Sequence, residues 1–183
     1  MRTAEAVKSV EVPVGVEVQV EGRVVTVKGE QGTVTRDFSK APVIIELEGN
    51  TVWVKASWPR KREAALVGTI SSHIRNMIIG VTKGFTHKLK IVFSHFPISV
   101  KVKEKTVLIE NFTGERSSRK VRIMGDVRVR AKGDDVVVQG ISLEEVSQTA
   151  ANIQNATKVK KKDPRVFLDG IYVYERLEGM ETS

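Results

Sequence analysis

The chain has 183 residues, with 30 Lys and Arg against 22 Asp and Glu, and its formal net charge is +8. It contains no cysteine, which excludes disulfides, thiolate metal sites and cysteine nucleophiles. No apolar stretch approaches the length of a membrane span, so we expect a soluble, cytoplasmic protein with no membrane partner. A hydrophobic content of 40% suffices for packed cores, and the positive charge favours a polyanionic partner, most simply RNA.

Two hairpins are predicted in the first half of the chain. Valine stands at every second position from Val14 to Val20, which is the period of a half-buried strand and places these valines on one side. The residues around Gly22 can turn this strand into a second one. A further alternating run leads into Gly49-Asn50, a pair that suits the positive φ values of a tight hairpin turn.

A helix is predicted from Pro59 to about Ile79, because its apolar residues follow steps of three and four. We expect Ser57 to be its N-cap, and Gly80 and Gly84 to mark its end. The apolar stripe consists of Val67, Ile70, Ile74, Met77 and Val81.

The second half of the chain repeats the first. The repeated pairs are 13–20 with 97–103, 43–54 with 127–138, and 66–76 with 145–155. A strand at 85–96 joins the copies, and Ser142 with Glu145 predicts a capping box before the second helix. The predicted fold class is α+β, with two duplicated domains, 1–85 and 86–183, each an antiparallel β-sheet covered by one main α-helix.

Several polar positions become basic in the second copy, while the apolar positions persist. In this alignment Glu17 becomes Lys101, Gln19 becomes Lys103, Glu46 becomes Arg130 and Glu48 becomes Lys132. We expect Val127, Val129 and Ala131 to face the core beneath the helix, so the basic residues that alternate with them should face outward. This pattern indicates that the second domain binds the polyanion.

The candidate RNA-binding residues all belong to the second domain. They are Lys101, Lys103, Arg116, Arg119, Lys120, Arg128, Arg130, Lys132, Lys158, Lys160, Lys161, Lys162 and Arg165. The basic stretch 116–132 contains a single acid, Asp126. The run 158–162 has a second interpretation, as a solvated charge run at a helix end, where cations complement the dipole. Only 5% of the residues are aromatic, which disfavours a base-stacking platform and favours binding to folded RNA by charge and shape.

The sequence offers no catalytic or metal centre. His73, His87 and His95 lack partners at metal-ligand spacing, and no G-x-S-x-G elbow is present. The glycines in 29–33 and 80–85 match no phosphate-binding motif and are better explained as turn and cap residues. We therefore expect no enzymatic activity, no cofactor and no metal.

Residues 60–85 (RKREAALVGTISSHIRNMIIGVTKGF) and 163–175 (DPRVFLDGIYVYE), embedded in two such repeats, resemble the family of large ribosomal subunit protein six, known as protein nine in eukaryotes. The resemblance covers essentially the whole chain. The FLDGIYV ending is similar to the archaeal and eukaryotic branch, because residues 168–171 replace the GKGI-type segment of bacterial members.

The resemblance implies a structural protein without catalytic activity, built from two duplicated α+β domains, with large-subunit rRNA as its partner. It also implies a position near the stalk base, with neighbouring ribosomal proteins, beside the site where translational GTPases dock. The alternative from charge alone is a free basic RNA-binding or RNA-chaperone module.

Overall fold

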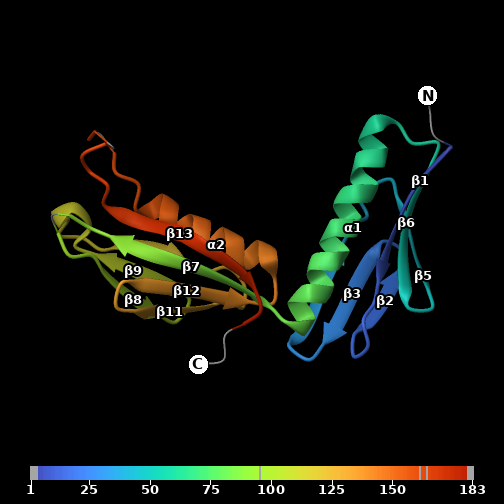
Figure 1. The fold of residues 1–183 in the computed structure, drawn as a ribbon, viewed down its shortest axis with the longest axis horizontal. Coiled ribbons are helices and arrows are strands. Elements are labelled where there is room, and N and C mark those ends of the chain that lie inside the picture. Colours follow the sequence, from blue (N-terminus) through green and yellow to red (C-terminus); the bar gives the residue numbers. More distant parts are fainter. Residues whose placement is uncertain (1–3, 95, 161, 164, 181–183) are drawn as a thin grey trace. The chain divides into compact units, whose positions relative to one another are not determined.

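The computed structural model describes residues 4–94, 96–160, 162–163 and 165–180. Contacts divide the chain into two compact units, Met1–Lys83 (unit 1) and Gly84–Ser183 (unit 2). The division falls two residues before the boundary expected at Phe85. Among the described residues, no sheet takes strands from both units (Figure 1).

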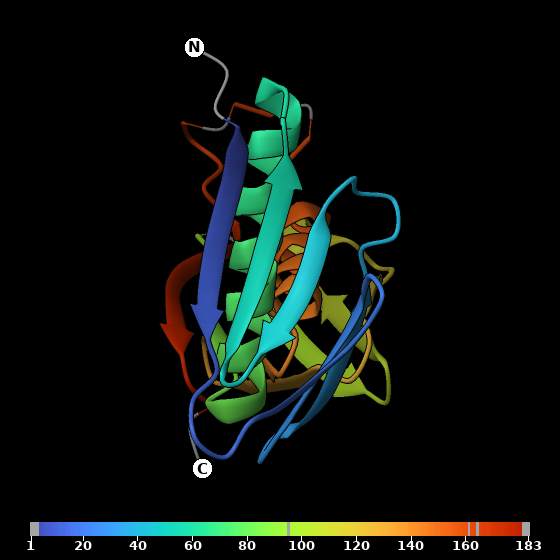
Figure 2. The same cartoon turned by 90° about the vertical axis from the view of Figure 1, so that its right-hand side faces the viewer.

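Unit 1 consists of two antiparallel sheets and one long helix. Its elements are β1 (Glu5–Glu11), β2 (Glu17–Glu21), β3 (Val24–Gly29), β4 (Gly32–Asp37), β5 (Ile44–Glu48), β6 (Thr51–Ser57) and α1 (Lys61–Thr82). Each sheet has three strands, in the orders β1-β6-β5 and β2-β3-β4. Figure 2 shows α1 behind the β1-β6-β5 sheet, across one of its faces, and α1 also contacts β3 and β4 of the other sheet.

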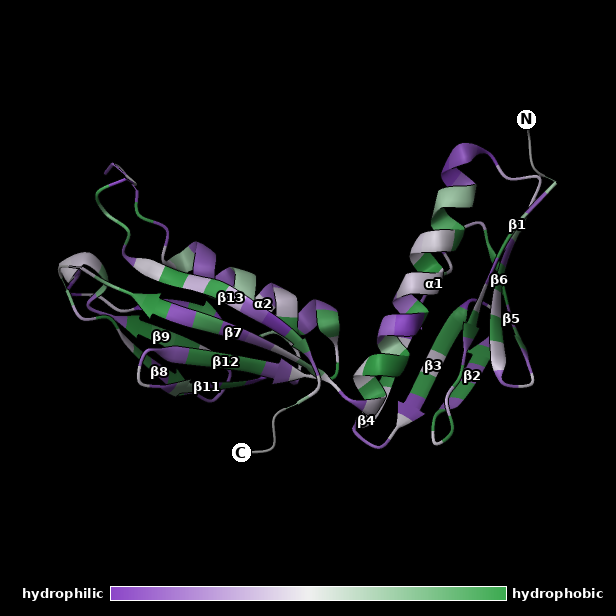
Figure 3. Cartoon of the chain, viewed as in Figure 1, coloured by the Kyte–Doolittle hydropathy of each residue, from purple (hydrophilic) through white to green (hydrophobic). Residues whose placement is uncertain are grey.

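One apolar core joins both sheets of unit 1 to α1. Val25 and Val27 of β3, Val52 and Val54 of β6, and Ile74 of α1 are fully buried in it. The whole predicted stripe of the helix is buried, which confirms that interpretation. Along the strands, apolar and polar residues alternate (Figure 3), as expected for sheets with one face on a core and one face in water.

Unit 2 repeats this plan and adds one strand. Its elements are β7 (Phe85–Val92), β8 (Ser99–Lys103), β9 (Thr106–Glu110), the short 3-10 helix η1 (Phe112–Gly114), β10 (Arg119–Arg122), β11 (Arg128–Lys132), β12 (Asp135–Gly140), α2 (Leu143–Ala156) and β13 (Gly170–Glu178). The sheet orders are β11-β12-β7-β13 and β10-β9-β8. The helix α2 contacts β7, β12 and β13 of one sheet and β10 of the other, so both sheets pack on the same helix.

The predicted fold class is confirmed, and the strands are arranged in more detail than the sequence indicated. Each unit holds two sheets, because the meanders β2-β3-β4 and β8-β9-β10 hydrogen-bond only within themselves. The predicted strand at 85–96 is β7, which lies between β12 and β13. Strand β13 follows α2 in the chain. It pairs with β7 along the edge opposite to the one that pairs with β12.

The ends of the helices differ in part from the prediction. The helix α1 begins at Lys61 with Arg60 as its N-cap. Ser57 is not the N-cap, because it is the last residue of β6 and pairs with Glu5. Gly80 lies inside the helix. For α2, Ser142 is the N-cap, as predicted: its side chain accepts a hydrogen bond from the backbone of the third helical residue, Glu145, at 3.4 Å, which is one half of the predicted capping box.

The first predicted strand begins three residues later than its valines suggested. Val14 is fully exposed and lies in a turn, closed by a hydrogen bond from the Val16 N–H to the Pro13 carbonyl at 3.3 Å. Gly15 supplies the positive φ of 91° in this turn. The strand itself starts at Glu17.

Candidate nucleic-acid interface

Four cations share the outer face of the β10-β9-β8 sheet. Lys101 and Lys103 lie on β8, and Lys120 and Arg122 lie on β10. The cross-strand rows are Lys101–Leu108–Lys120 and Lys103–Thr106–Arg122. Residues directly opposite one another in antiparallel strands point to the same face, so each row has a cation at both ends. We call these four residues the β8–β10 face.

The geometry of the β8–β10 face suits a phosphate backbone. All four cations are exposed, and two strand spacings separate the ends of each row by about 10 Å. Lys101 forms an ion pair with Glu110 at 2.7 Å. At 57% and 38% exposure of the two side chains, such a pair contributes at most about 1 kcal/mol and can be exchanged for a phosphate.

Unit 1 has the same two rows without their cations. They are Gln19–Thr26–Thr35 and Glu21–Val24–Asp37. The row nearest the hairpin turn therefore carries two carboxylates in unit 1 and two cations in unit 2. This inversion separates the two units by charge on a surface where their backbone pairing is the same.

These registers correct the predicted alignment of the first hairpin. The last pair before the turn is Glu21 with Val24 in unit 1 and Lys103 with Thr106 in unit 2. Gln19, and not Glu17, therefore corresponds to Lys101. A shift of two residues leaves the alternation of inward and outward side chains unchanged, so the sequence pattern could not reveal it.

A second row of cations follows β11. Arg128, Arg130 and Lys132 are exposed on this edge strand, while Val127 and Val129 are buried, as predicted. Ala131 is exposed rather than in the core, because it stands next to the hairpin turn at the end of the strand. The pairs Leu47 with Val52 and Ala131 with Val136 occupy the same place in the two hairpins, which confirms the predicted replacement of Glu46 and Glu48 by Arg130 and Lys132.

The β11 row lies close to the β8–β10 face. Strands β8 and β11 are in contact although they belong to different sheets. On β7, two strands away from β11, Lys88 pairs with Glu175 at 3.1 Å and Lys90 pairs with Asp135 at 3.3 Å. The exposed cations of β11 therefore lie beside those of β8, and Lys90, like Lys101, takes part in an exposed ion pair.

Arg119 occupies a different environment from the other candidates. Its guanidinium pairs with Glu115 and donates a hydrogen bond to the Ala156 carbonyl at the end of α2. It also lies 4.3 Å from the centroid of the Phe112 ring. The hydrogen bond from Arg119 holds the pKa of the Glu115 carboxyl below its usual range. The positive charge of Arg119 is thus paired with groups of unit 2 itself. Arg116, in contrast, is exposed.

The basic residues after α2 form a separate group. Lys158, Lys160 and Lys162 are exposed, and the Lys162 ammonium lies 4.4 Å from the centroid of the Phe167 ring. Arg165 forms an ion pair with Asp163 at 3.0 Å, and its hydrogen bonds lower the pKa of that carboxyl. The remaining candidate, Lys161, lies outside the described residues.

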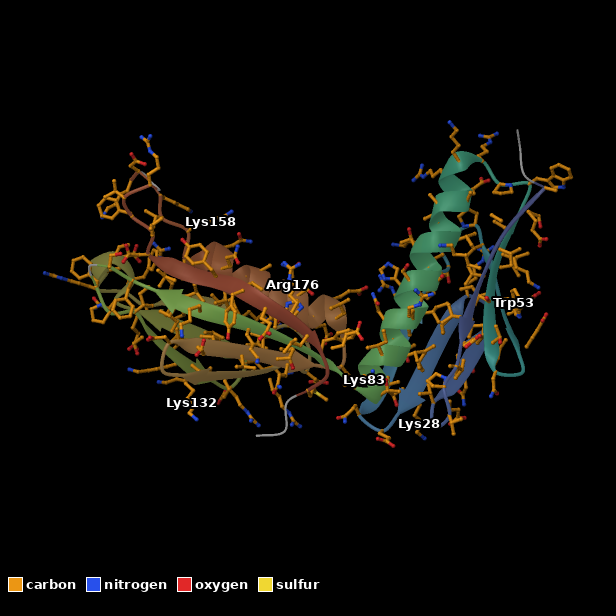
Figure 4. All side chains as sticks on the ribbon, viewed as in Figure 1. Lys28, Trp53, Lys83, Lys132, Lys158 and Arg176 are labelled. Carbon is orange, nitrogen blue, oxygen red and sulfur yellow. The ribbon has the colours of Figure 1, made fainter. Side chains whose placement is uncertain are left out.

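The structure does not bring the two predicted basic clusters together. Figure 4 shows Lys132 on the outer side of the four-stranded sheet and Lys158 on the side where α2 lies.

Arg122 completes the β8–β10 face although it was absent from the set of candidate residues predicted from the sequence. The signal for it was present: Lys120 and Arg122 flank Val121, which is buried.

The described histidines, His73 and His87, pack within the two units. His73 stacks on Phe38, with ring centroids 6.3 Å apart, and its Nδ1 lies 3.2 Å from Arg36. His87 is buried in unit 2, and His95 lies outside the described residues. No group of three His, Asp or Glu that could hold a metal exists among the described residues. In the same part of the chain, no helix is long and apolar enough to cross a membrane.

Comparison with known proteins identifies the family. The model of the family described as ribosomal protein L6 matches residues 12–84 and 96–170, once for each unit. The chain belongs to the ribosomal protein L6 family. The family resemblance predicted from the sequence is thereby confirmed, and with it the expectation of a ribosomal protein rather than an enzyme.

Individual relatives agree over nearly the full length. The chain is 54% identical to the large ribosomal subunit protein uL6 of Aeropyrum pernix, over 96% of this chain and 97% of that protein. It is 50% identical to the protein of the same name from Desulfurococcus amylolyticus, over 98% and 99%. It is 46% identical to the uL6 protein of Methanosarcina mazei, over 94% of this chain and 98% of that protein. These archaeal relatives confirm the archaeal type of the L6 chain.

Proposed function

We propose that this L6 chain is a structural constituent of the large ribosomal subunit in the cytoplasm, and that unit 2 holds it there by binding large-subunit rRNA. Membership of the L6 family supports the assignment to the large ribosomal subunit. The observation that supports the RNA site is the pair of rows on the β8–β10 face, where Lys103 and Arg122 stand in the places of Glu21 and Asp37.

The mode of binding follows from the residues of this face. Between the cations stand Thr106 and Leu108, and no aromatic side chain is among the β8 to β10 residues of this outer face, all of which the structure describes. The face therefore has no platform for stacking bases, and it reads the phosphate backbone and shape of folded RNA. Each phosphate that it neutralises releases counterions, so affinity should fall steeply with salt.

We further propose a position near the stalk base, in contact with neighbouring ribosomal proteins and beside the docking site of the translational GTPases. Membership of the L6 family supports this position. A cross-linking map of the chain within the large subunit tests it: cross-links to rRNA and proteins remote from the stalk base would contradict it.

The proposed RNA site is tested by giving unit 2 the charges of unit 1. The variant combines Lys103→Glu with Arg122→Asp, and binding to large-subunit rRNA is measured by filter binding over a range of salt concentrations. Both side chains are exposed, so the free energy of unfolding should change by no more than about 0.5 kcal/mol per substitution. The slope of log K against log salt should decrease by roughly 0.7–0.9 for each phosphate that the variant no longer neutralises.

A matched control makes the same change in net charge on unit 1. Lys28→Glu with Lys40→Glu alters two exposed cations there. If this control weakens RNA binding as much as the unit 2 variant does, only the global charge matters and the β8–β10 face is not the site.

The alternative of a free RNA-binding module is tested separately. An L6 chain that is part of the subunit should co-sediment with large subunits through high-salt sucrose gradients. Release into the light fractions under conditions that keep other subunit proteins bound would favour the free module.

A further inference from the structure

The turn between β6 and α1 in unit 1 exposes a tryptophan on a strained backbone. The Trp58 side chain is 73% exposed, and its φ is +48°. A bulky residue with positive φ is a conformational outlier that costs folding free energy. The conformation is fixed: the Trp58 N–H donates a hydrogen bond to the Ala4 carbonyl at 2.8 Å, and Pro59 is buried.

Three consecutive cations follow this tryptophan. Arg60 is the N-cap of α1, and Lys61 and Arg62 are its first two residues. All three side chains are exposed. The amino-terminal end of a helix carries partial positive charge, so each cation there is electrostatically unfavourable. The first turn contains one acid, Glu63, whose carboxylate accepts a hydrogen bond from the Arg60 N–H at 2.8 Å.

We infer that residues 58–62, which we call the Trp58 turn, form a second RNA contact, on unit 1. An unpaired base stacks on the Trp58 ring, and the phosphates beside it bind Arg60, Lys61 and Arg62. Two features that destabilise the folded chain, a strained φ and cations against a helix dipole, meet in this segment beside an exposed ring. Such local conflicts mark functional sites. The phosphates of an RNA strand would neutralise the cations at the helix start, and one of its bases would cover the exposed ring.

The Trp58 turn differs in kind from the β8–β10 face. Stacking of a base on an aromatic side chain contributes about 1–3 kcal/mol and needs an unpaired nucleotide, whereas the unit 2 face offers cations alone. Phosphates also suit a helix amino terminus, where backbone N–H groups and the dipole favour negative charge. Unit 1 would therefore select single-stranded RNA, whereas unit 2 binds folded RNA. This inference rests on the proposed function only in taking the ligand to be RNA.

The tryptophan itself can report the binding of RNA. The chain has two tryptophans, so in the full-length Trp53→Phe variant Trp58 is the only one. A single-stranded adenine 12-mer should quench its fluorescence, and a blunt RNA duplex should quench it much less. Lys61→Gln with Arg62→Gln should weaken binding of the 12-mer and reduce the salt slope by about 0.7 for each phosphate left without its cation. Equal quenching by polyglutamate would overturn the inference and indicate an acidic protein partner.

A glycine substitution separates binding from folding. Trp58→Gly removes the ring and adopts the positive φ without strain, so the melting temperature should stay the same or rise. Affinity for a fluorescently labelled 12-mer should nevertheless fall about 5- to 150-fold. Unchanged affinity would overturn the inference. If the Lys103→Glu, Arg122→Asp variant loses rRNA binding while Trp58→Gly does not affect the 12-mer, the Trp58 site alone is refuted and the proposed function stands.

Discussion

The guanidinium of Arg119 lies over the ring of Phe112, 4.3 Å from its centroid, at the point where η1 leads to β10. The same guanidinium pairs with Glu115 and donates a hydrogen bond to the Ala156 carbonyl. Arg119 therefore connects the β10-β9-β8 sheet to the end of α2. Its neighbour Lys120 is exposed and points to the opposite face of the strand. Two adjacent basic residues thus have separate roles, one in folding and one in the candidate interface.

Replacing Arg119 should destabilise unit 2. Arg119→Gln removes a charge-assisted hydrogen bond, an ion pair and a cation–π contact in a partly buried setting, and we expect unit 2 to lose about 1–3 kcal/mol. Urea unfolding followed by circular dichroism measures this. The matched control is Lys120→Gln, which should change stability by no more than about 0.5 kcal/mol while it weakens rRNA binding. The reverse pattern would place Arg119 in the interface.

Unit 1 should be sensitive to a single methyl group at Gly29. A Cβ there would lie 2.7 Å from the Val81 carbonyl oxygen and 2.8 Å from the Val81 Cγ2. The same carbonyl accepts a hydrogen bond from the Gln31 N–H at 2.9 Å, so the hairpin is held against the end of α1. We expect Gly29→Ala to destabilise unit 1 by about 1–3 kcal/mol.

The prediction at Gly29 has an internal control. Gly49 has open space around its Cβ position but a positive φ of 59°, so Gly49→Ala reports backbone strain without a clash. Hydrogen exchange measured by mass spectrometry should show faster exchange in unit 1 for Gly29→Ala and little change in unit 2. Equal effects in both units would contradict an independent core in unit 1.

The stability of unit 2 should decrease in mild acid because of His87. Burial lowers the pKa of this imidazole, and the nearby Arg176 lowers it further. Below the ordinary His pKa of about 6.5, the unfolded chain takes up a proton that the folded chain does not. The stabilisation is therefore complete above that pH and is lost as the pH falls toward the lowered folded pKa. Unfolding midpoints between pH 8 and pH 5 measure this, and in His87→Gln that part of the decrease should disappear.

Sequence periodicity predicted the faces of most residues well and their partners poorly. Val127, Val129 and the stripe of α1 were assigned correctly, because burial repeats every second residue in a strand and every third or fourth in a helix. Lys103 and Arg122 are 19 positions apart in the sequence, and they share a row only because both pair with Thr106. Pairing of this kind depends on register, which alternation alone does not specify.

The sequence predicted two basic clusters in unit 2, and the structure separates them. Lys158 comes two residues after the end of α2, before the chain reaches β13 at the edge of the four-stranded sheet. Lys158 therefore stands on the helix side, away from Lys132 (Figure 4). Charge density along the sequence predicted a basic unit 2, and it could not show on which side each cation lies.

The lysines after α2 should contribute to RNA binding according to how free their charges are. Lys158 and Lys160 are exposed, whereas the charge of Arg165 is paired with Asp163 at 3.0 Å. Lys158→Gln with Lys160→Gln should weaken binding to all RNA sequences alike and reduce the salt slope by roughly 0.7–0.9 for each lysine that neutralises a phosphate. Arg165→Gln should change the slope less, because Asp163 already offsets the guanidinium. Filter-binding titrations at matched salt compare the two variants. If the double variant lowers affinity while its salt slope equals that of the parent, these lysines act on the fold of the chain after α2 and do not bind phosphates.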